Sequence, residues 1–232
     1  MKNLFLFSTA LFTALVISSC NSDDLNLQAA EVAGSNYMYE MNELPTFSSP
    51  VNEISQTEID GLIQMREEEK LALDVYDSFY DSYKLVVFDR ISNSESRHTT
   101  AVLSLINYFG LSDPAKTEIG QFSNADIQTL YDQLIAAGNS SVEALKIGAY
   151  IEEYDIADLK ELINETENID IKTVYSHLLR GSENHLRAFV RNLKVRGTVY
   201  EHQLLNSDDY DTILKGESIA PVLDSAGNCI NN

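Results

Sequence analysis

Apolar residues recur three and four positions apart in four long segments of the chain, which is the spacing that gathers them on one face of a helix. The apolar stripes contain, in chain order, Ile59, Leu62, Ile63, Leu73, Tyr76 and Tyr80; Ile91, Val102, Leu105, Ile106 and Phe109; Leu145, Gly148, Ala149, Ile156, Leu159 and Ile163; and Val174, Leu178, Gly181, Ala188 and Phe189. The sequence "SQTE" fits a capping box at the first start, and Gly110 and Gly197 follow the second and fourth segments as stop signals. The pattern therefore predicts helices over about residues 55–83, 88–109, 140–163 and 170–195.

The connections between these helices are short, except for about thirty residues between the second and the third. Within that crossover, "NADIQTLYDQLIAAG" predicts a short helix capped by Asn124 and ended by Gly138. A further short helix is predicted over residues 208–214, capped by Ser207, and no segment alternates as a strand. Four long helices with one long central crossover have the connectivity of ferritin-like bundles. We therefore predict an all-α, ferritin-like four-helix domain over residues 54–215, followed by a C-terminal tail at 216–232.

Each apolar stripe is interrupted near its centre by polar side chains that can bind a metal ion. These are Glu69 in the first, Glu95 and His98 in the second, Glu152 in the third and His185 in the fourth. Carboxylates buried together would repel one another, and their pKa values would rise. Around iron or manganese the same carboxylates and imidazoles form a ligand shell, and donors three residues apart on a helix face one metal. The sequence predicts a metal centre, with iron as the first choice and manganese as the alternative.

Each of these residues also has an ordinary explanation. Glu95 could complete a capping box with Ser92 if its helix began later. The other acids could lie on solvated faces, and the histidines could be satisfied core or boundary residues. A polar centre closed by hydrogen bonds, without metal, is a further alternative. The shared position of all five residues at the centre of consecutive stripes favours the metal.

Several acids beside the candidate ligands fall outside the stripes. Glu67 and Glu68 are predicted to lie toward the sides of the first helix. Glu153 is about a quarter-turn from Glu152 and is predicted to be solvated. Glu183 is predicted to point away from the core. The runs "REEEK", "IEEY" and "SENH" therefore each contribute one core-facing candidate ligand.

The first nineteen residues have the order of a secretory signal peptide, with a positive start at Lys2 and a short apolar run. Small residues then precede Cys20, as in a lipobox, although an ordinary signal peptide with an incidental cysteine is the alternative. We predict that residues 1–19 are removed, that Cys20 is lipidated, and that residues 20–53 form a tether. The lipid would then hold the protein at the membrane. Only Cys229 would remain, so no internal disulfide could form.

The formal net charge of −20 limits the partners that the protein can bind. Such a chain repels nucleic acid and attracts cations. Acidic residues in "NSDD", directly after Cys20, resemble surface-export signals of some Gram-negative lipoproteins. The predicted location is a bacterial cell envelope, at the outer membrane or cell surface. The predicted partner is the membrane, through the lipid anchor, and a homodimer is compatible with the tether.

Four segments, "MREEEKLALDVY", "SESRHTTAV", "GAYIEEYDIADL" and "LLRGSENHLRAF", resemble the signature segments of a ferritin-like domain family of unknown function, domain of unknown function 2202. The resemblance covers about residues 54–215 and keeps the order of the segments. It implies a four-helix ferritin-like fold with a metal centre, but no assigned reaction. The wider superfamily implies a di-iron oxidoreductase that acts on oxygen, peroxide or ferrous iron, here with an external electron donor.

The sequence departs from the di-iron pattern of that superfamily, which has two Glu-x-x-His pairs. The fourth helix offers Ser182 three residues before His185, where the pattern has glutamate. Asp155, three residues after Glu152, is the candidate for the missing sixth ligand. A non-catalytic lipoprotein that binds metal or a partner is therefore the alternative function.

Overall fold

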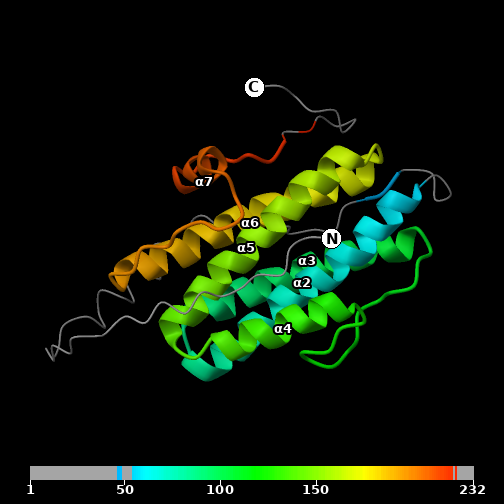
Figure 1. Ribbon diagram of the computed structural model, residues 1–232. Coiled ribbons are helices and arrows are strands. Elements are labelled where there is room, and N and C mark those ends of the chain that lie inside the picture. Colours follow the sequence, from blue (N-terminus) through cyan, green and yellow to red (C-terminus); the bar gives the residue numbers. More distant parts are fainter. Residues whose placement is uncertain (1–45, 49–53, 222, 224–232) are drawn as a thin grey trace, which may run out of the picture.

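The structure, a computed structural model, describes residues 46–48, 54–221 and 223. This part of the chain contains six helices and no strand (Figure 1). The helices are α2 (Gln56–Tyr83), α3 (Val86–Tyr108), α4 (Ala125–Ala137), α5 (Ser141–Glu165), α6 (Ile169–Val195) and α7 (Ser207–Leu214). The predicted all-helical class is confirmed. The predicted signal peptide, the lipidated Cys20, most of the tether and the end of the tail lie outside the described residues.

Local capping marks several of the helix boundaries. The Ser55 side chain accepts the Glu58 backbone N–H, and the Ser55 N–H donates to the Glu58 carboxylate at 2.7 Å, so the predicted capping box is present. Gly110 follows α3 with a φ of +68°, a backbone conformation that favours glycine. Asn206, and not Ser207, caps α7, so that prediction was wrong by one residue.

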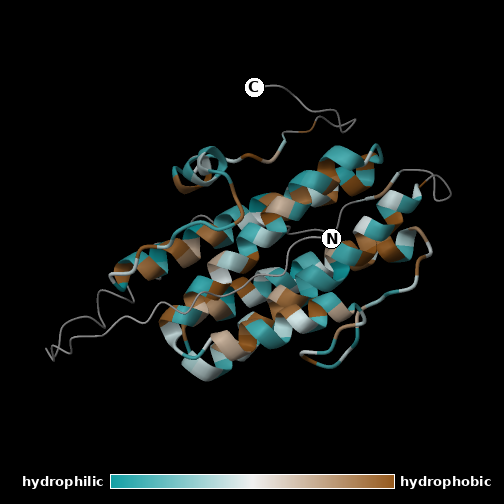
Figure 2. Ribbon diagram, in the orientation of Figure 1, coloured by the Kyte–Doolittle hydropathy of each residue, from teal (hydrophilic) through white to brown (hydrophobic). Residues whose placement is uncertain are grey.

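The four long helices pack together through their apolar faces. Helix α2 contacts α3 and α5, and helix α6 contacts α5 and α3 (Figure 1). Short connections, at residues 84–85 and 166–168, join α2 to α3 and α5 to α6. In Figure 2 each long helix carries apolar residues together with polar ones, as expected of helices that bury one side. Each fully buried aliphatic side chain, such as Leu62 or Leu178, contributes roughly 1.5–3 kcal/mol relative to exposure.

The buried face of α2 is wider than its predicted stripe. Leu62 and Tyr76 are fully buried, but the remaining stripe residues are only partly buried. The other buried apolar side chains of α2 are Met65, Leu71, Ala72, Val75 and Phe79. Helix α2 also contacts α4, which lies in the crossover between α3 and α5. Contacts with three helices therefore bury more of α2 than one stripe can cover.

Four acids that were predicted to lie outside the core are buried, so that prediction was wrong. Glu67 is 2% exposed, and Glu68, Glu153 and Glu183 are 0% exposed. A buried carboxylate is costly unless it is paired or hydrogen-bonded. Three of these acids, Glu67, Glu153 and Glu183, accept hydrogen bonds from backbone N–H groups of segments that connect or follow the helices.

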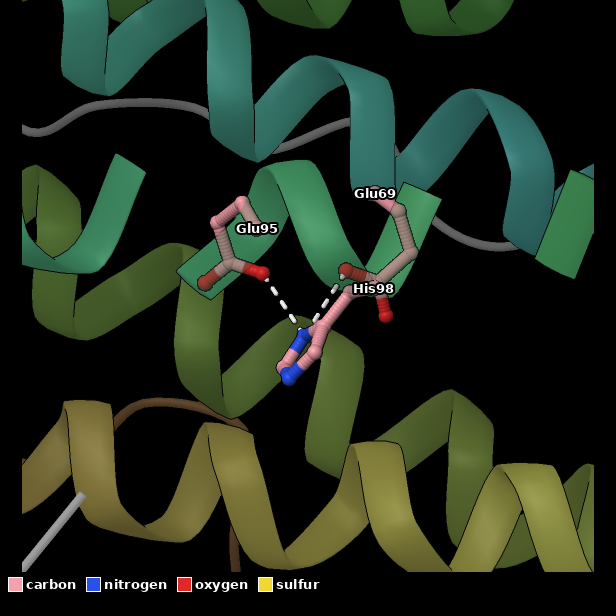
Figure 3. A group of neighbouring side chains, drawn as sticks. All are labelled: Glu69, Glu95 and His98. Atoms are coloured by element: carbon pink, nitrogen blue, oxygen red, sulfur yellow. Dashed lines mark hydrogen bonds and ion pairs between the residues drawn. The ribbon is translucent and has the colours of Figure 1, made fainter. Parts of the chain in front are cut away.

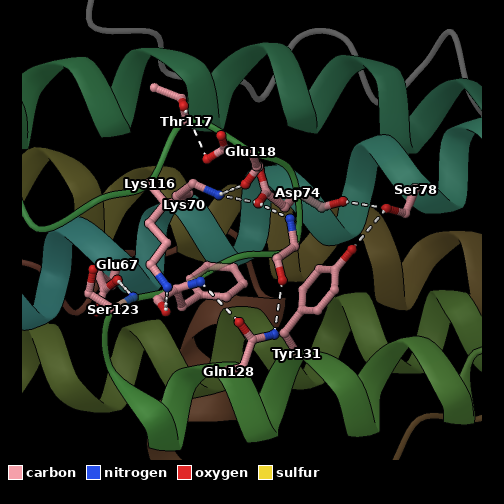
Figure 4. A network of polar contacts seen from close by, with 12 residues as sticks. Glu67, Lys70, Asp74, Ser78, Lys116, Thr117, Glu118, Ser123, Gln128 and Tyr131 are labelled. Carbon is pink, nitrogen blue, oxygen red and sulfur yellow. Dashed lines mark hydrogen bonds and ion pairs between the residues drawn. The ribbon is translucent and has the colours of Figure 1, made fainter.

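Glu67 and two neighbours on α2 hold the crossover in place (Figure 4). The Glu67 carboxylate accepts the backbone N–H groups of residues 123–124 at 2.6 and 2.8 Å, directly before α4. Lys70 donates to Asp74 and, at 3.0 Å, to the backbone carbonyl of Glu118. A segment that crosses the surface of a helix needs partners for its backbone groups, and these side chains supply them.

Glu153 and Glu183 hold the chain that follows α6. Glu153 Oε2 accepts the backbone N–H groups of residues 203–205 at 2.8–3.0 Å. Glu183 Oε1 accepts those of residues 219–220 at 2.8 and 3.2 Å. The helix α7, between these two segments, packs on α6. The buried acids thus attach the outer segments to the long helices.

In the part of the chain that the structure describes, none of the helices combines the length and the apolar character needed to span a membrane.

We expect Glu153→Gln to lower the free energy of unfolding by about 2–3 kcal/mol, because a neutral amide is a weaker acceptor and brings its own donor toward three N–H groups. Guanidinium denaturation followed by circular dichroism measures the effect. The control Glu201→Gln changes an exposed acid in the neighbouring segment, and its effect should stay within about 0.5 kcal/mol. Equal stability of the two variants would contradict the role assigned to Glu153.

Candidate metal centre

All five predicted ligands come together between the four long helices. Glu69 comes from α2, Glu95 and His98 from α3, Glu152 from α5 and His185 from α6, and each is at most 4% exposed. Figure 3 shows Glu69, Glu95 and His98 pointing toward one another. Helix α3 begins at Val86, so Ser92 lies inside the helix and cannot be its N-cap. The capping-box explanation of Glu95 is therefore excluded.

The side chains form two groups that share Glu95. In the first group, His98 Nδ1 lies 2.8 Å from Glu95 Oε2 and 3.2 Å from Glu69 Oε2. In the second, His185 Nδ1 lies 2.7 Å from Glu95 Oε1 and 3.5 Å from Glu152 Oε2. Within each group one potential ligand atom per residue lies within 4.8 Å of the others. Glu95 thus directs one oxygen to each histidine, and the two imidazole rings stack with centroids 5.4 Å apart.

Several atoms of these groups are buried without a hydrogen-bond partner. They are Glu69 Oε1, Glu95 Oε1, Glu152 Oε2 and His185 Nδ1. His185 Nδ1 and Glu95 Oε1 are in close contact but do not have hydrogen-bond geometry. Buried polar atoms are nearly always paired, and a cation shared by these atoms would pair them. The donor set therefore fits a metal ion better than a network closed by hydrogen bonds alone.

The electrostatics of the groups follow from burial and mutual charge. Burial raises the pKa of Glu69 to about 7 and that of Glu152 to about 6, although a histidine charge opposes each shift. For Glu95 the charges of His185 and His98 outweigh burial, and its pKa is lowered. Burial alone would lower the histidine pKa values, but the carboxylates raise that of His185 to about 9. Without a cation, burial therefore favours the protonated forms of Glu69 and Glu152, and the carboxylates favour the charged form of His185.

Two residues of α2 and α6 position the ligands. The Tyr76 hydroxyl donates to Glu152 Oε1 at 2.6 Å, as expected of a buried tyrosine. Gly181 lies against His98, because a Cβ at this position would be 2.5 Å from the His98 Cε1 and Nε2 atoms. The sequence showed Gly181 only as a small residue in an apolar stripe. Its contact with an imidazole from another helix could not be found from spacing.

The proposed sixth ligand stands apart from both groups. Asp155 is 1% exposed and neither of its oxygens has a hydrogen-bond partner, but it is not a member of either group. Burial, followed by the charges of Glu69 and Glu152, raises its pKa well above the ordinary value. Ser182 donates to the Leu178 carbonyl of its own helix at 3.3 Å. Asp155 as a ligand therefore stays a prediction.

Comparisons with known proteins cover the whole candidate site. A family model described as an uncharacterized protein domain (DUF2202) matches residues 58–217. The uncharacterized protein MJ0754 of Methanocaldococcus jannaschii is 47% identical over 173 residues, which are 74% of this chain and 94% of the relative. A crystal structure of the hypothetical protein MJ0754 from Methanococcus jannaschii matches with a TM-score of 0.71 and 46% identity, over 74% of this chain and 99% of that chain.

We expect the metal-free protein to lose stability as the pH rises from about 5 to about 9. The Glu69 pKa is about 7 in the folded state against an ordinary 4.5, so the folded state keeps a proton that the unfolded chain releases. The His185 pKa is about 9 against 6.5, so the stability from its charge is lost as the pH rises through that range. Urea denaturation of the chelator-treated chain at several pH values measures the change.

The matched variant for this experiment is Glu69→Gln, which removes one of the carboxyl groups with a raised pKa. Its stability should depend less on pH between about 4.5 and 7, while the fall toward pH 9 should remain. A metal-free protein of constant stability from pH 5 to 9 would show that the groups do not hold these protons.

Proposed function

The chain belongs to the DUF2202 family of uncharacterized protein domains, and we propose that its four long helices form a ferritin-like four-helix bundle that binds a pair of metal ions. The observation that carries the proposal is Glu95, which directs one oxygen to each of two carboxylate/histidine groups drawn from all four helices. Support for the bundle comes from the pairwise packing of α2, α3, α5 and α6 and from the long crossover that contains α4.

The two groups divide the ligands between two ions. Glu69 and His98 would hold one ion, Glu152 and His185 the other, and Glu95 would bridge them. Carboxylate and imidazole donors suit iron and manganese, and iron is the metal that we propose, with manganese as the alternative. Three carboxylates offset three of the four positive charges of two divalent ions. Asp155, buried nearby without a hydrogen-bond partner, would supply a fourth negative charge when a cation replaces its proton.

A pair of redox-active ions in this shell would supply electron transfer to oxygen or peroxide, or the oxidation of ferrous iron. The protein's own contribution is to position and enclose the ligands. The Tyr76 hydroxyl fixes one oxygen of Glu152, and the burial of all five ligands excludes bulk water. The sequence holds two cysteines, Cys20 and Cys229, which are too few for a cysteine-ligated electron-transfer centre. Repeated turnover would therefore need an external electron donor.

A non-catalytic metal-binding protein is the second candidate function, and one observation favours it. Ser182 occupies the position where a second Glu-x-x-His pair would have its glutamate, and its hydroxyl bonds within its own helix. The site then has one carboxylate fewer than the di-iron pattern. Such a site could hold metal for structure, for scavenging or for a partner without reacting with oxygen.

We further propose that the protein is an exported lipoprotein, held at the outer membrane or cell surface through Cys20. The support is the order of positive start, apolar run, small residues and cysteine in residues 1–20. A tether of about thirty residues would then connect the four-helix domain to the lipid. An electron donor or a second copy of the chain would have to reach it there.

We expect the wild-type chain to bind about two iron or manganese ions, one for each of the two groups of ligands. Glu69→Gln and Glu152→Gln should each reduce the stoichiometry to about one, whereas Glu95→Gln should reduce both sites. Elemental analysis of protein loaded under metal-replete conditions measures the ratio. The control Glu201→Gln should bind as the wild type does. An undiminished metal content in Glu95→Gln would sink the shared-ligand arrangement.

The iron-loaded samples also separate the two candidate functions. If the site is redox-active, anaerobic ferrous protein should change its visible spectrum and consume oxygen or peroxide when these are added. An inert spectrum with both metals bound would favour the non-catalytic function.

We expect Cys20→Ala to lose both fatty-acid labelling and membrane association when the full precursor is expressed in a Gram-negative bacterium. The thioether-linked lipid supplies the apolar surface that enters the bilayer. Labelling with a radioactive fatty acid and membrane fractionation measure the two effects. Cys229→Ala is the matched control and should keep both. A Cys20→Ala protein that remains labelled would refute lipidation at this cysteine.

A further inference from the structure

A row of acids on α5 leads from the candidate metal centre to the protein surface. Glu152, Asp155, Asp158 and Glu161 follow one another at intervals of three residues. Each such step falls about 60° short of a full helical turn, so the row winds around the helix. The exposed fraction rises along it, from 0% at Glu152 through 1% at Asp155 and 6% at Asp158 to the exposed Glu161. The row thus connects the core to solvent.

Helix α2 contributes a second carboxylate beside this row. The Gln64 side-chain amide donates from Nε2 to Glu68 Oε1 at 2.8 Å and from the same nitrogen to Asp158 Oδ2 at 2.9 Å. One neutral nitrogen therefore lies between two carboxylates from facing helices. A cation at the same place would satisfy both more fully, because it offsets their charge as well.

Two buried side chains of these helices have carboxylate oxygens without hydrogen-bond partners. They are Glu68, at Oε2, and Asp155, at both carboxylate oxygens, and each is at most 1% exposed. After burial, the charges of Glu69, Glu152 and Glu68 all contribute to the raised pKa of Asp155. On α5, Asp155 lies three residues after Glu152 of the metal centre and three residues before Asp158 of the bridged pair. An entering cation would pair with these unpartnered buried oxygens.

The outer end of the row opens into a surface cleft between α2 and α5. The cleft is lined by Gln64, Asp158, Glu161, Leu162 and Glu165. Three of its five lining residues are acidic. A cleft lined by one sign of charge concentrates counter-ions and accelerates their capture.

We infer that the cleft between α2 and α5 is the entry site for divalent cations, captured by Asp158 and Glu68 and passed by Asp155 to the metal centre. The inference rests on the proposed function, since the route leads to the two ligand groups. The Gln64 amide would move aside as an ion enters, because its nitrogen lies between the capturing carboxylates. The ion keeps its charge throughout, and no bond other than coordination forms or breaks.

The test is the rate at which the full chain, stripped of metal by a chelator, takes up Co²⁺, followed by visible absorbance in a stopped-flow instrument. Asp158→Asn should slow uptake about fivefold to tenfold, because the capturing charge is lost. The final amount of bound Co²⁺ should equal that of the wild type. Asp211→Asn removes the same charge from an exposed position on α7, and its uptake rate should stay within about twofold of the wild type.

The possible outcomes separate the entry site from the metal centre. If Asp158→Asn and Asp211→Asn load equally fast, the entry site is wrong and the metal centre stands. A wild-type chain that binds no Co²⁺, iron or manganese would overturn both proposals. A reduced final amount in Asp158→Asn would make Asp158 a ligand and not part of a route. If Asp158→Asn loses helix content, the variant Glu161→Gln, at an exposed position, replaces it in the experiment. This variant must slow uptake at least about twofold.

Discussion

Burial of negative charge is the constraint on which this structure depends. A carboxylate is buried at low cost only when hydrogen-bond donors or cations replace its water. In this structure, acids paired with donors lie beside acids of the candidate metal centre. Glu153 is satisfied by three backbone N–H groups, whereas its neighbour Glu152 faces His185 and the Tyr76 hydroxyl. The same division separates Glu67 from Glu69. One acid of each pair attaches an outer segment, and the other faces the shared interior.

The candidate metal centre joins the fold to the proposed function. No helix supplies a complete group of ligands, because α3 contributes Glu95 and His98 while the remaining donors come from α2, α5 and α6. The site therefore exists only when the long helices are assembled, and metal binding would add its free energy to folding. Helices α3 and α6 approach closely at Gly181, because the His98 imidazole occupies the space that a side chain at this position would need.

The distribution of acidic residues is uneven, and one row of them on α5 reaches the core. A formal net charge of −20 is expected to oppose binding to nucleic acid. Most of that charge needs no further explanation. The row on α5 differs because its members become progressively buried and because Asp155 has no hydrogen-bond partner. The proposed entry site and the proposed metal centre are thus two ends of one acidic row.

The sequence by itself determined the long helices, the capping box at Ser55 and the five inward donors, because helical periodicity and capping are local properties. Burial of Glu67, Glu68, Glu153 and Glu183 was decided only by the tertiary structure. Three of them pair with N–H groups more than thirty positions away, and Glu68 faces Asp158 through Gln64. The sharing of Glu95 and the closeness of Gly181 to His98 likewise arise between helices. Spacing along a chain shows which side of a helix a residue occupies, but not which distant group will meet it there.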